Sequence, residues 1–266
     1  MLFDFLWLSA FVLLASILSL KLRLLAPSGS IAAAAAGICI AFGTGWRGLA
    51  LLGLFFLTSS LWSVYKKKQK TAMEEKQGKG ARRNWLQVAA NGGLAAVFSI
   101  IYAFDPQIMW LSAFSISLAS ANSDTWSSEI GALSKSYPIS IRTWRKAAAG
   151  TSGAVSVLGS AAGAAGSLVI AGGAGLLFSF PSGHMMAIFL FGCIGNILDT
   201  FIGAYWQASY RCAYCGVDME KSKHCGSRAE LVSGYRWMTN DAVNFASGSA
   251  AALLGIGCLF WLSYPL

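Results

Sequence analysis

Long apolar runs separated by shorter polar segments dominate the pattern of the chain. Runs of about 17–25 mainly apolar residues are typical of helices that cross a bilayer. Eight such runs predict spans at roughly 2–20, 27–44, 47–65, 85–104, 107–123, 148–178, 183–207 and 238–262. The run 107–123 is short and ends in polar residues, which leaves a half-span or re-entrant helix open for it. The pattern predicts an all-α, polytopic membrane bundle.

The composition supports one transmembrane domain over residues 1–266. The chain is 56% hydrophobic and 12% charged, against roughly 45–50% and about 25% in an ordinary soluble domain. These values exclude soluble globular proteins, disordered chains and small disulfide scaffolds. The first seven residues contain Asp4 and no basic residue, so we expect the first span to be a retained anchor.

The basic residues supply an independent test of the spans. Nineteen of the 20 Lys and Arg fall after spans one, three, five and seven, and Arg47 alone falls on the other side. The positive-inside rule then predicts that both termini face outward. Loops 66–84, 124–147 and 208–237 are expected in the cytoplasm, with the active site facing it from the plasma membrane. Topology and anionic lipid explain this charge, so no nucleic-acid partner is expected.

Acidic and amide side chains interrupt three of the predicted spans. An acid within a span costs roughly 2.5–3.5 kcal/mol on insertion scales, so such residues are usually functional. Asp124 and Ser128 share a face if 121–131 is helical, with Glu129 beside it. Asp199 follows Asn196 inside an apolar run, and Asp241 and Asn244 repeat that spacing.

The three acidic clusters all fall near the predicted cytoplasmic ends of their helices. Three carboxylates, from Asp124, Asp199 and Asp241, are therefore expected to meet at one depth. Oxygen ligands of this kind suit Mg²⁺, which leaves its other positions to water and substrate phosphates. The alternative is that each acid is an interfacial residue bonded to its own helix end.

The segment before span four has the residues of a phosphate site. Lys79, Arg82 and Arg83 are flanked by glycines and precede a helix N-terminus, where an anion is favoured. Lys66 to Lys70 are expected to be solvated. Thr151 and Ser152, at the predicted start of span six, form a second candidate phosphate-binding site. No P-loop sequence is present.

Four residues of the last loop form a possible zinc site. Cys212 and Cys215 are followed by His224 and Cys225, and three thiolates with an imidazole can close a tetrahedral structural Zn²⁺ site. The alternative is a set of reduced surface thiols.

Five motifs in order carry a family resemblance. They are Gly-Lys-Gly-x-Arg-Arg-x3-Gln-Val-x-Ala-Asn-Gly (78–92), Ala-Asn-Ser-Asp-Thr-Trp-Ser-Ser-Glu-Ile-Gly (121–131), Gly-Thr-Ser-Gly-x-Val-Ser-x2-Gly (150–159), Gly-Asn-x2-Asp-Thr-x2-Gly-Ala (195–204) and Asn-Asp-x2-Asn-Phe (240–245). The chain resembles the phytyl-phosphate kinase family, which includes the vertebrate transmembrane protein nineteen, over roughly residues 30–260.

The resemblance implies transfer of a phosphoryl group from a nucleoside triphosphate such as CTP to an isoprenyl monophosphate, giving the diphosphate. The implied Mg²⁺ ligands are Asp124, Asp199 and Asp241, with Glu129 in support. The residues that the resemblance implies for binding phosphates or the nucleotide are Lys79, Arg82, Arg83, Asn91, Asn122, Thr151, Ser152, Asn196, Asn240 and Asn244. The lipid tail is expected among the spans.

Three other functions stay open. A cytidylyltransferase uses the same ion and nucleotide but joins the nucleotide monophosphate to the lipid phosphate. Intramembrane acids also mark transporters and flippases. A structural scaffold is the last alternative, and a homodimer formed through the glycine-rich span is left open.

Overall fold

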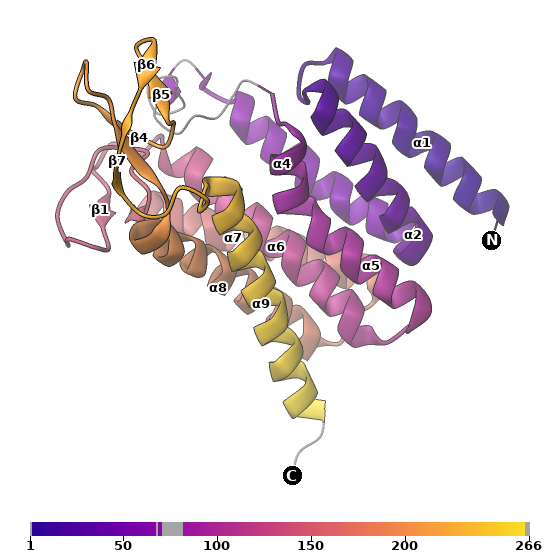
Figure 1. The fold of residues 1–266 in the computed structure, drawn as a ribbon. Coiled ribbons are helices and arrows are strands. Elements are labelled where there is room, and N and C mark those ends of the chain that lie inside the picture. The colour runs from indigo at the N-terminus through magenta and orange to yellow at the C-terminus, as the bar shows by residue number, and fades with distance from the viewer. Residues whose placement is uncertain (1, 68, 71–81, 264–266) are drawn as a thin grey trace.

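The fold is a bundle of long helices with small β elements at one end, seen in a computed structural model that describes residues 2–67, 69–70 and 82–263 (Figure 1). The helices are α1 (Leu2–Lys21), α2 (Pro27–Val64), α4 (Trp85–Val88), the π-helical turn η1 (Ala89–Gly93), α5 (Leu94–Phe104), α6 (Ile108–Gly131), α7 (Val157–Phe178), α8 (Ser182–Trp206) and α9 (Asn240–Ser263). Because α4, η1 and α5 are continuous, they form one helical segment of the bundle. Each such segment is called a leg below.

Helix α2 is a hairpin of two legs that turns at Gly45, whose backbone is non-helical (φ 64°, ψ −153°). The first leg runs parallel to the α4–α5 leg, because Gly29 lies against Arg83 and Gly43 lies against Ser99. The second leg runs back along α6. There Ser59 Oγ donates to Asn122 Oδ1 at 3.1 Å and Ser63 Oγ donates to Glu129 Oε1 at 2.8 Å.

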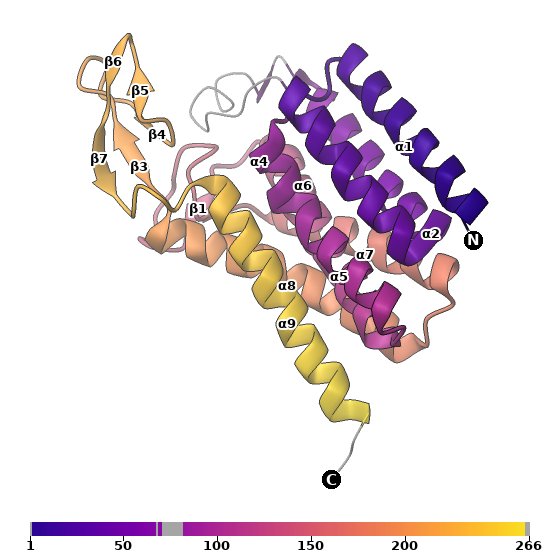
Figure 2. The same cartoon turned by 45° about the vertical axis from the view of Figure 1, so that its right-hand side comes forward.

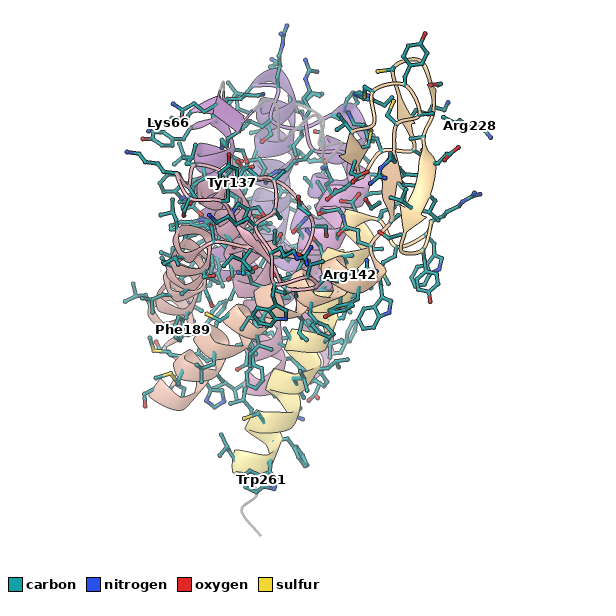
Figure 3. The ribbon with its side chains drawn as sticks, turned by 90° about the vertical axis from the view of Figure 1, so that its left-hand side faces the viewer. Lys66, Tyr137, Arg142, Phe189, Arg228 and Trp261 are labelled. Atoms are coloured by element: carbon teal, nitrogen blue, oxygen red, sulfur yellow. The ribbon has the colours of Figure 1, made fainter. Side chains whose placement is uncertain are left out.

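With α2 counted as two legs, the described chain has the eight legs that the hydrophobic pattern predicts. In the described ranges, six helices are long and apolar enough to cross a membrane, α2 being one of them. The eighth leg is α6. Figure 3 shows Lys66 and Arg228 toward the end of the bundle opposite Trp261. The end that carries Lys66 and Arg228 is called the basic end below.

Helix α6 is the centre of the bundle, and it is longer than the half-span that the sequence left open for 107–123. It has 24 residues, or about 36 Å of helix, enough to cross a hydrocarbon core of about 30 Å. Every residue from 111 to 123 is buried. Its apparent shortness in the sequence comes from buried serines, several of which bond to carbonyls of their own helix, as Ser115 does to Leu111 at 2.8 Å.

Small residues allow the other legs to approach α6 closely. A Cβ added at Gly163 or Gly166 of α7 would meet Ser123 or Asn122 within about 3 Å, and one at Gly195 of α8 would meet Ser120. Close approach of this kind is how helices pack in lipid. The glycine-rich face of α7 is therefore used within the chain itself.

The outward faces of the helices are apolar and suited to lipid. Phe3, Trp7, Leu14, Leu176 and Trp261 are all more than 60% exposed. Contiguous apolar surface on this scale is unfavourable in water and natural in a bilayer.

The small strands lie at the basic end. Strands β1 (Ile139–Ser140) and β2 (Ala154–Val155) pair antiparallel in the loop before α7. The loop between α8 and α9 holds β3 (Ser209–Arg211), β4 (Asp218–Met219), β5 (Lys223–His224), β6 (Ser227–Arg228) and β7 (Glu230–Ser233). The order β4-β3-β7 makes one sheet and β5-β6 a hairpin. Figure 2 shows this lobe projecting beside the start of α9.

The predicted start of span six at residue 148 is wrong by nine residues. Gly150 and Gly153 have positive φ values of 81° and 73°, which an α-helix does not accept. Helix α7 begins at Val157, and the side chain of Ser156 caps it by accepting from the backbone N–H of Gly159.

Candidate functional site

Carboxylates from α6 and α8 meet in a small cavity near the basic end of the bundle. The cavity, of about 10 Å³, is lined by Ala90, Asn91, Leu94, Ser117, Ser120, Ala121, Asp124, Asp199, Asn244, Ser247 and Gly248. This volume holds a single water-sized occupant. The polar lining atoms come from α6, α8, α9 and the π-helical turn η1, so four separate legs converge on one point.

The amides of Asn91 and Asn244 present oxygen to this cavity. The amide nitrogen of Asn91 donates to the Gln87 carbonyl at 2.8 Å. The Asn244 amide satisfies its other neighbours when its nitrogen donates to Asp199 Oδ2 at 2.8 Å and to the Asn240 carbonyl at 3.0 Å. The other polar atom of the Asn244 amide lies 3.4 Å from Asn91 Oδ1. In that orientation the Asn244 amide oxygen faces Asn91 Oδ1.

The three aspartates divide between two cavities that share Asp124, Asn91 and Asn244. Asp199 accepts from Ser247 Oγ at 3.1 Å, and Ser247 lies six residues beyond Asp241 on α9, or about 9 Å along the helix. Asp241 lines the larger cleft described next, whereas Asp199 lines the small cavity, and Asp124 lines both. Asp124 therefore lies between a deeper and a shallower carboxylate.

A cleft of about 470 Å³ extends from the acidic residues to an apolar wall. One wall is apolar and comes from α1 and both legs of α2; it includes Phe11, Val12, Leu18, Leu22, Ala33, Gly37, Leu49, Leu52, Gly53, Phe55, Phe56 and Leu57. The other end is polar and is lined by Lys67, Arg83, Gln87, Asn91, Asp124, Thr125, Ser128, Glu129, Asn240, Asp241 and Asn244. This volume lies within the usual range for small-molecule sites, roughly 300–1,000 Å³.

Arg83 is held rigidly at the polar end. Its backbone pairs with the α1–α2 linker, because its N–H donates to the Leu24 carbonyl at 3.2 Å and its carbonyl accepts from Ala26 at 2.9 Å. Its guanidinium lies 5.7 Å from the Phe56 ring centre. Burial lowers the pKa of Arg83 and Glu129 opposes that shift, while a guanidinium stays charged at any ordinary pH.

The residue after Arg83, Asn84, caps helix α4. Asn84 and Gln87 form a capping box, each side chain bonding to the backbone of the other. Asn91 follows one turn later in η1, and π-helical turns of this kind are frequent at functional sites. The motif 78–92 thus places a cation and an amide at the cleft.

Glu129 forms a buried ion pair with Lys70, which contradicts the expectation that Lys70 is solvated. The Lys70 side chain is 1% exposed and its Nζ lies 2.5 Å from Glu129 Oε2. Nζ also donates to the Trp62 carbonyl at 2.6 Å. Since Ser63 donates to the other Glu129 oxygen, both oxygens have protein partners. Glu129 thus holds the Lys70 ammonium group in position beside the cleft.

Several predicted site residues lie away from both cavities. The fully buried Asn122 accepts from Thr58 and Ser59 and donates to the Gly166 carbonyl, so its amide joins helices. Asn196 faces Gly163 of α7. Thr151 bonds to the Ala148 carbonyl, and Ser152 bonds to Gln207, the C-cap residue of α8. Arg82 is exposed, and Lys79 lies outside the described residues.

The structure adds Lys67, Gln87 and Ser247 to the candidate site. Gln87 has one signal in the sequence, its place in the motif 78–92. Ser247 has none, because it is one of many serines in apolar helices. Lys67 was hidden in a basic run whose members look alike in sequence.

The cysteines of the α8–α9 loop form a second, separate cluster. Ligand atoms of Cys212, Cys215, His224 and Cys225 all lie within 4.8 Å of one another, the only such group of three or more His, Cys, Asp or Glu among the described residues. Backbone N–H groups of Cys215 and Tyr214, with His224, lower the pKa of Cys212 to about 6. Burial and the neighbouring thiols raise the pKa of Cys225 to about 11.

Comparison with protein families matches nearly the whole chain. The model of the family described as integral membrane protein DUF92 matches residues 10–252. No solved structure matches the chain.

Three curated proteins illustrate the similarity. Protein PGR of Arabidopsis thaliana is 32% identical over 259 residues, which cover 86% of this chain and 87% of that protein. An uncharacterized membrane protein of Synechocystis is 30% identical over 259 residues, covering 94% and 90%. Protein VTE6, chloroplastic, of Arabidopsis thaliana is 28% identical over 236 residues, covering 84% and 64%.

The buried ion pair yields a prediction about stability. Lys70→Met leaves the Glu129 carboxylate without its cation in a low-dielectric site, so we expect a loss of roughly 3–5 kcal/mol. Lys70→Met combined with Glu129→Gln should recover at least half of that loss, because the double variant removes both charges. Unfolding of the detergent-solubilised protein measures both effects, and strictly additive losses would contradict a direct pair.

Proposed function

The chain belongs to the integral membrane family DUF92, and from that premise we propose that it is a membrane kinase that transfers a phosphoryl group from a nucleoside triphosphate, such as CTP, to an isoprenyl monophosphate. The family resemblance carried by the five sequence motifs is confirmed by this membership. The reaction itself is the proposal, and the geometry of the cleft supports it.

The observation that carries the proposal is the continuity of the cleft. One space joins an apolar wall on α1 and α2 to a polar end that holds two cations and several acids. An isoprenyl phosphate has the same division, a long hydrocarbon tail and a small anionic head. The tail would lie against the apolar wall and the head would reach Arg83 and Lys67, since guanidinium and ammonium groups bind phosphate oxygens.

The acidic residues fit a divalent cation. The small cavity offers carboxylates of Asp124 and Asp199 and the facing amide oxygens of Asn91 and Asn244, all of them hard oxygen donors. Mg²⁺ prefers such donors and usually takes only one or two carboxylates. Asp124 and Asp199 would hold the ion, which when bound would neutralise charge on the transferring phosphates.

Asp241 and Asn240 would act at the shallower mouth of the cleft. Both residues belong to the first turn of α9 and line the cleft beside Asn244. The start of α9 is capped by Thr239, whose Oγ1 accepts from the Ala242 N–H at 3.3 Å, so the side chains of Asp241 and Asn240 are the groups that would act there. These residues would orient the nucleotide, whereas the Lys70–Glu129 ion pair would stabilise the protein wall at the polar end of the cleft.

The proposed step needs positioning rather than a strong base. A phosphate oxygen of the isoprenyl monophosphate attacks the γ-phosphorus of the nucleotide, and the bond from that phosphorus to the β-phosphate oxygen breaks. The products are the isoprenyl diphosphate and the nucleoside diphosphate. Because the attacking phosphate is already an anion, no proton must be removed, and positive charge supplies most of the catalysis.

The direct test is turnover by purified protein. A matrix of CTP, ATP, GTP and UTP against phytyl and geranylgeranyl phosphate, with Mg²⁺, should yield a prenyl diphosphate and a nucleoside diphosphate. Asp124→Asn and Asp199→Asn should each lower kcat/KM at least about 10²-fold, as loss of one preorganised electrostatic contact does.

The matched control for these variants is Asp105→Asn. Asp105 follows α5 and accepts from Gln107 and Trp110, at the end of α5 away from Arg83, so its loss should leave turnover nearly unchanged. Release of pyrophosphate instead of the nucleoside diphosphate would identify a cytidylyltransferase. Substrate movement across proteoliposomes without nucleotide would favour a transporter, and either result would overturn the kinase proposal.

The cleft also predicts selectivity for tail length. A Cβ at Gly53 meets no atom within 4 Å, and Gly53 lines the apolar wall, so Gly53→Phe should fill the cleft without disturbing its neighbours. We expect KM for geranylgeranyl phosphate to rise by about tenfold or more, since a few buried methylenes are worth at least 1.4 kcal/mol.

Short acceptors should be nearly unaffected by Gly53→Phe, because their tails do not reach the filled part of the wall. Gly172→Phe on α7 is the control, as it also meets open space but lies outside the cleft. An equal effect of Gly53→Phe on short and long acceptors would contradict a tail site on this wall.

A further inference from the structure

The loop between α8 and α9 forms a small β lobe that has almost no hydrophobic core. Its buried apolar residues are Ala208, Tyr210, Cys212 and Met219, with Val217 and Ala229 packed against them. A lobe of about 30 residues cannot bury enough apolar surface to fold on that basis, and natural domains of this size add a disulfide or a metal. The lobe therefore requires another source of stability.

The Cys and His cluster lies where such a metal would connect the parts of the lobe. Cys212 and Cys215 belong to the turn between β3 and β4, whereas His224 and Cys225 belong to the β5–β6 hairpin. His224 Nδ1 lies 3.4 Å from Cys215 Sγ and 3.2 Å from Cys225 Sγ. Bonds of about 2.3 Å to sulfur and 2.0 Å to nitrogen put tetrahedral ligands about 3.5 Å apart. The observed separations are close to that value.

The backbone holds both turns in the shape that presents these ligands. Gly216 follows Cys215 with φ +69° and Gly226 follows Cys225 with φ +76°, conformations that favour glycine. The N–H of Gly216 donates to the Cys212 carbonyl at 2.9 Å, and the Cys212 N–H donates to Val217 at 3.1 Å. The turn is thus closed around Cys212 by its own hydrogen bonds.

We propose that Cys212, Cys215, His224 and Cys225 bind one structural Zn²⁺ that folds the β lobe and joins its two hairpins. Three thiolates and one imidazole complete a tetrahedral site and leave no open position for a substrate, which is the pattern of structural zinc. Because ligand sites of this kind do not exist in an unfolded loop, metal binding supplies folding free energy directly.

The zinc lobe is connected to both helices that carry the candidate site. Its base is closed by a bridge between Gln207 and Tyr235 and by a hydrogen bond of 2.9 Å from Ala208 N–H to the Met238 carbonyl. These residues directly follow α8, which bears Asp199, and precede α9, which bears Asp241. The metal would therefore fix how far apart the two helix ends lie.

Metal content tests the proposal independently of any catalytic activity. The full-length protein, purified in detergent without a metal-affinity resin, should contain about one zinc per chain by mass spectrometry of the metal. Cys212→Ser and Cys225→Ser should each lose most of that zinc. Cys258→Ser, which changes an exposed thiol of α9, is the control and should retain it.

A second measurement covers variants that fail to fold. In the wild-type protein, Cys212, Cys215 and Cys225 should resist alkylation until a zinc chelator is added, and Co²⁺ added to the stripped protein should give the spectrum of a tetrahedral thiolate site. Substoichiometric zinc in the wild type, or a Cys215–Cys225 disulfide in protein kept under reducing conditions, would overturn the proposal. Equal zinc in wild type and Cys212→Ser would overturn it as well.

Discussion

The fold depends on one constraint, that the polar helix α6 cannot face lipid. A polar group exposed to hydrocarbon has no partner there, so the serines, Asn122 and Asp124 of α6 must be covered by protein. The surrounding helices use glycine and alanine where they meet α6, and they present apolar side chains outward. The same arrangement brings the acids and amides of α8 and α9 against Asp124. Burial of α6 thus creates the candidate site.

Two acids and two basic residues of the site line different spaces. The acids Asp124 and Asp199 lie with amide oxygens in a cavity for one small occupant, and Arg83 and Lys67 lie in the cleft beside them. Glu129 is paired with Lys70, and both of its carboxylate oxygens have protein partners. Positive and negative groups that line one polar space suit a substrate that brings both phosphate and a divalent ion.

Much of the bundle could be predicted from the sequence. Long continuous apolar runs indicate the membrane spans, and the location of nearly all Lys and Arg on one side supports the same spans. Even the hairpin of α2 follows from the polar break near Arg47. The extent of α6 could not be predicted, because hydropathy counts serine as polar whether or not its hydroxyl bonds to its own helix. The start of α7 differs for another reason: an apolar run does not show backbone conformation, and the positive φ values of Gly150 and Gly153 are visible only in the structure.

The candidate site was only partly predictable for a related reason. Spacing along one helix shows which acids share a face, but the depth of one helix against another is set by packing. Asp199 of α8 bonds to Ser247, about 9 Å along α9 from Asp241, and spacing within one helix does not show this. Lys70 looks like its basic neighbours in sequence, and only the fold shows that it reaches Glu129. Asn122 looked functional because polar residues in spans usually are, yet its amide joins α2 and α7 to α6.

The central claim is that Asp124 and Asp199 hold one divalent cation within the bundle. Anomalous diffraction from crystals grown with Mn²⁺ and a non-hydrolysable nucleoside triphosphate tests it most directly. The account predicts one strong peak in the cavity lined by Asp124, Asp199, Asn91 and Asn244. A cavity without a peak, while the ion and nucleotide are bound elsewhere on the protein, would contradict it.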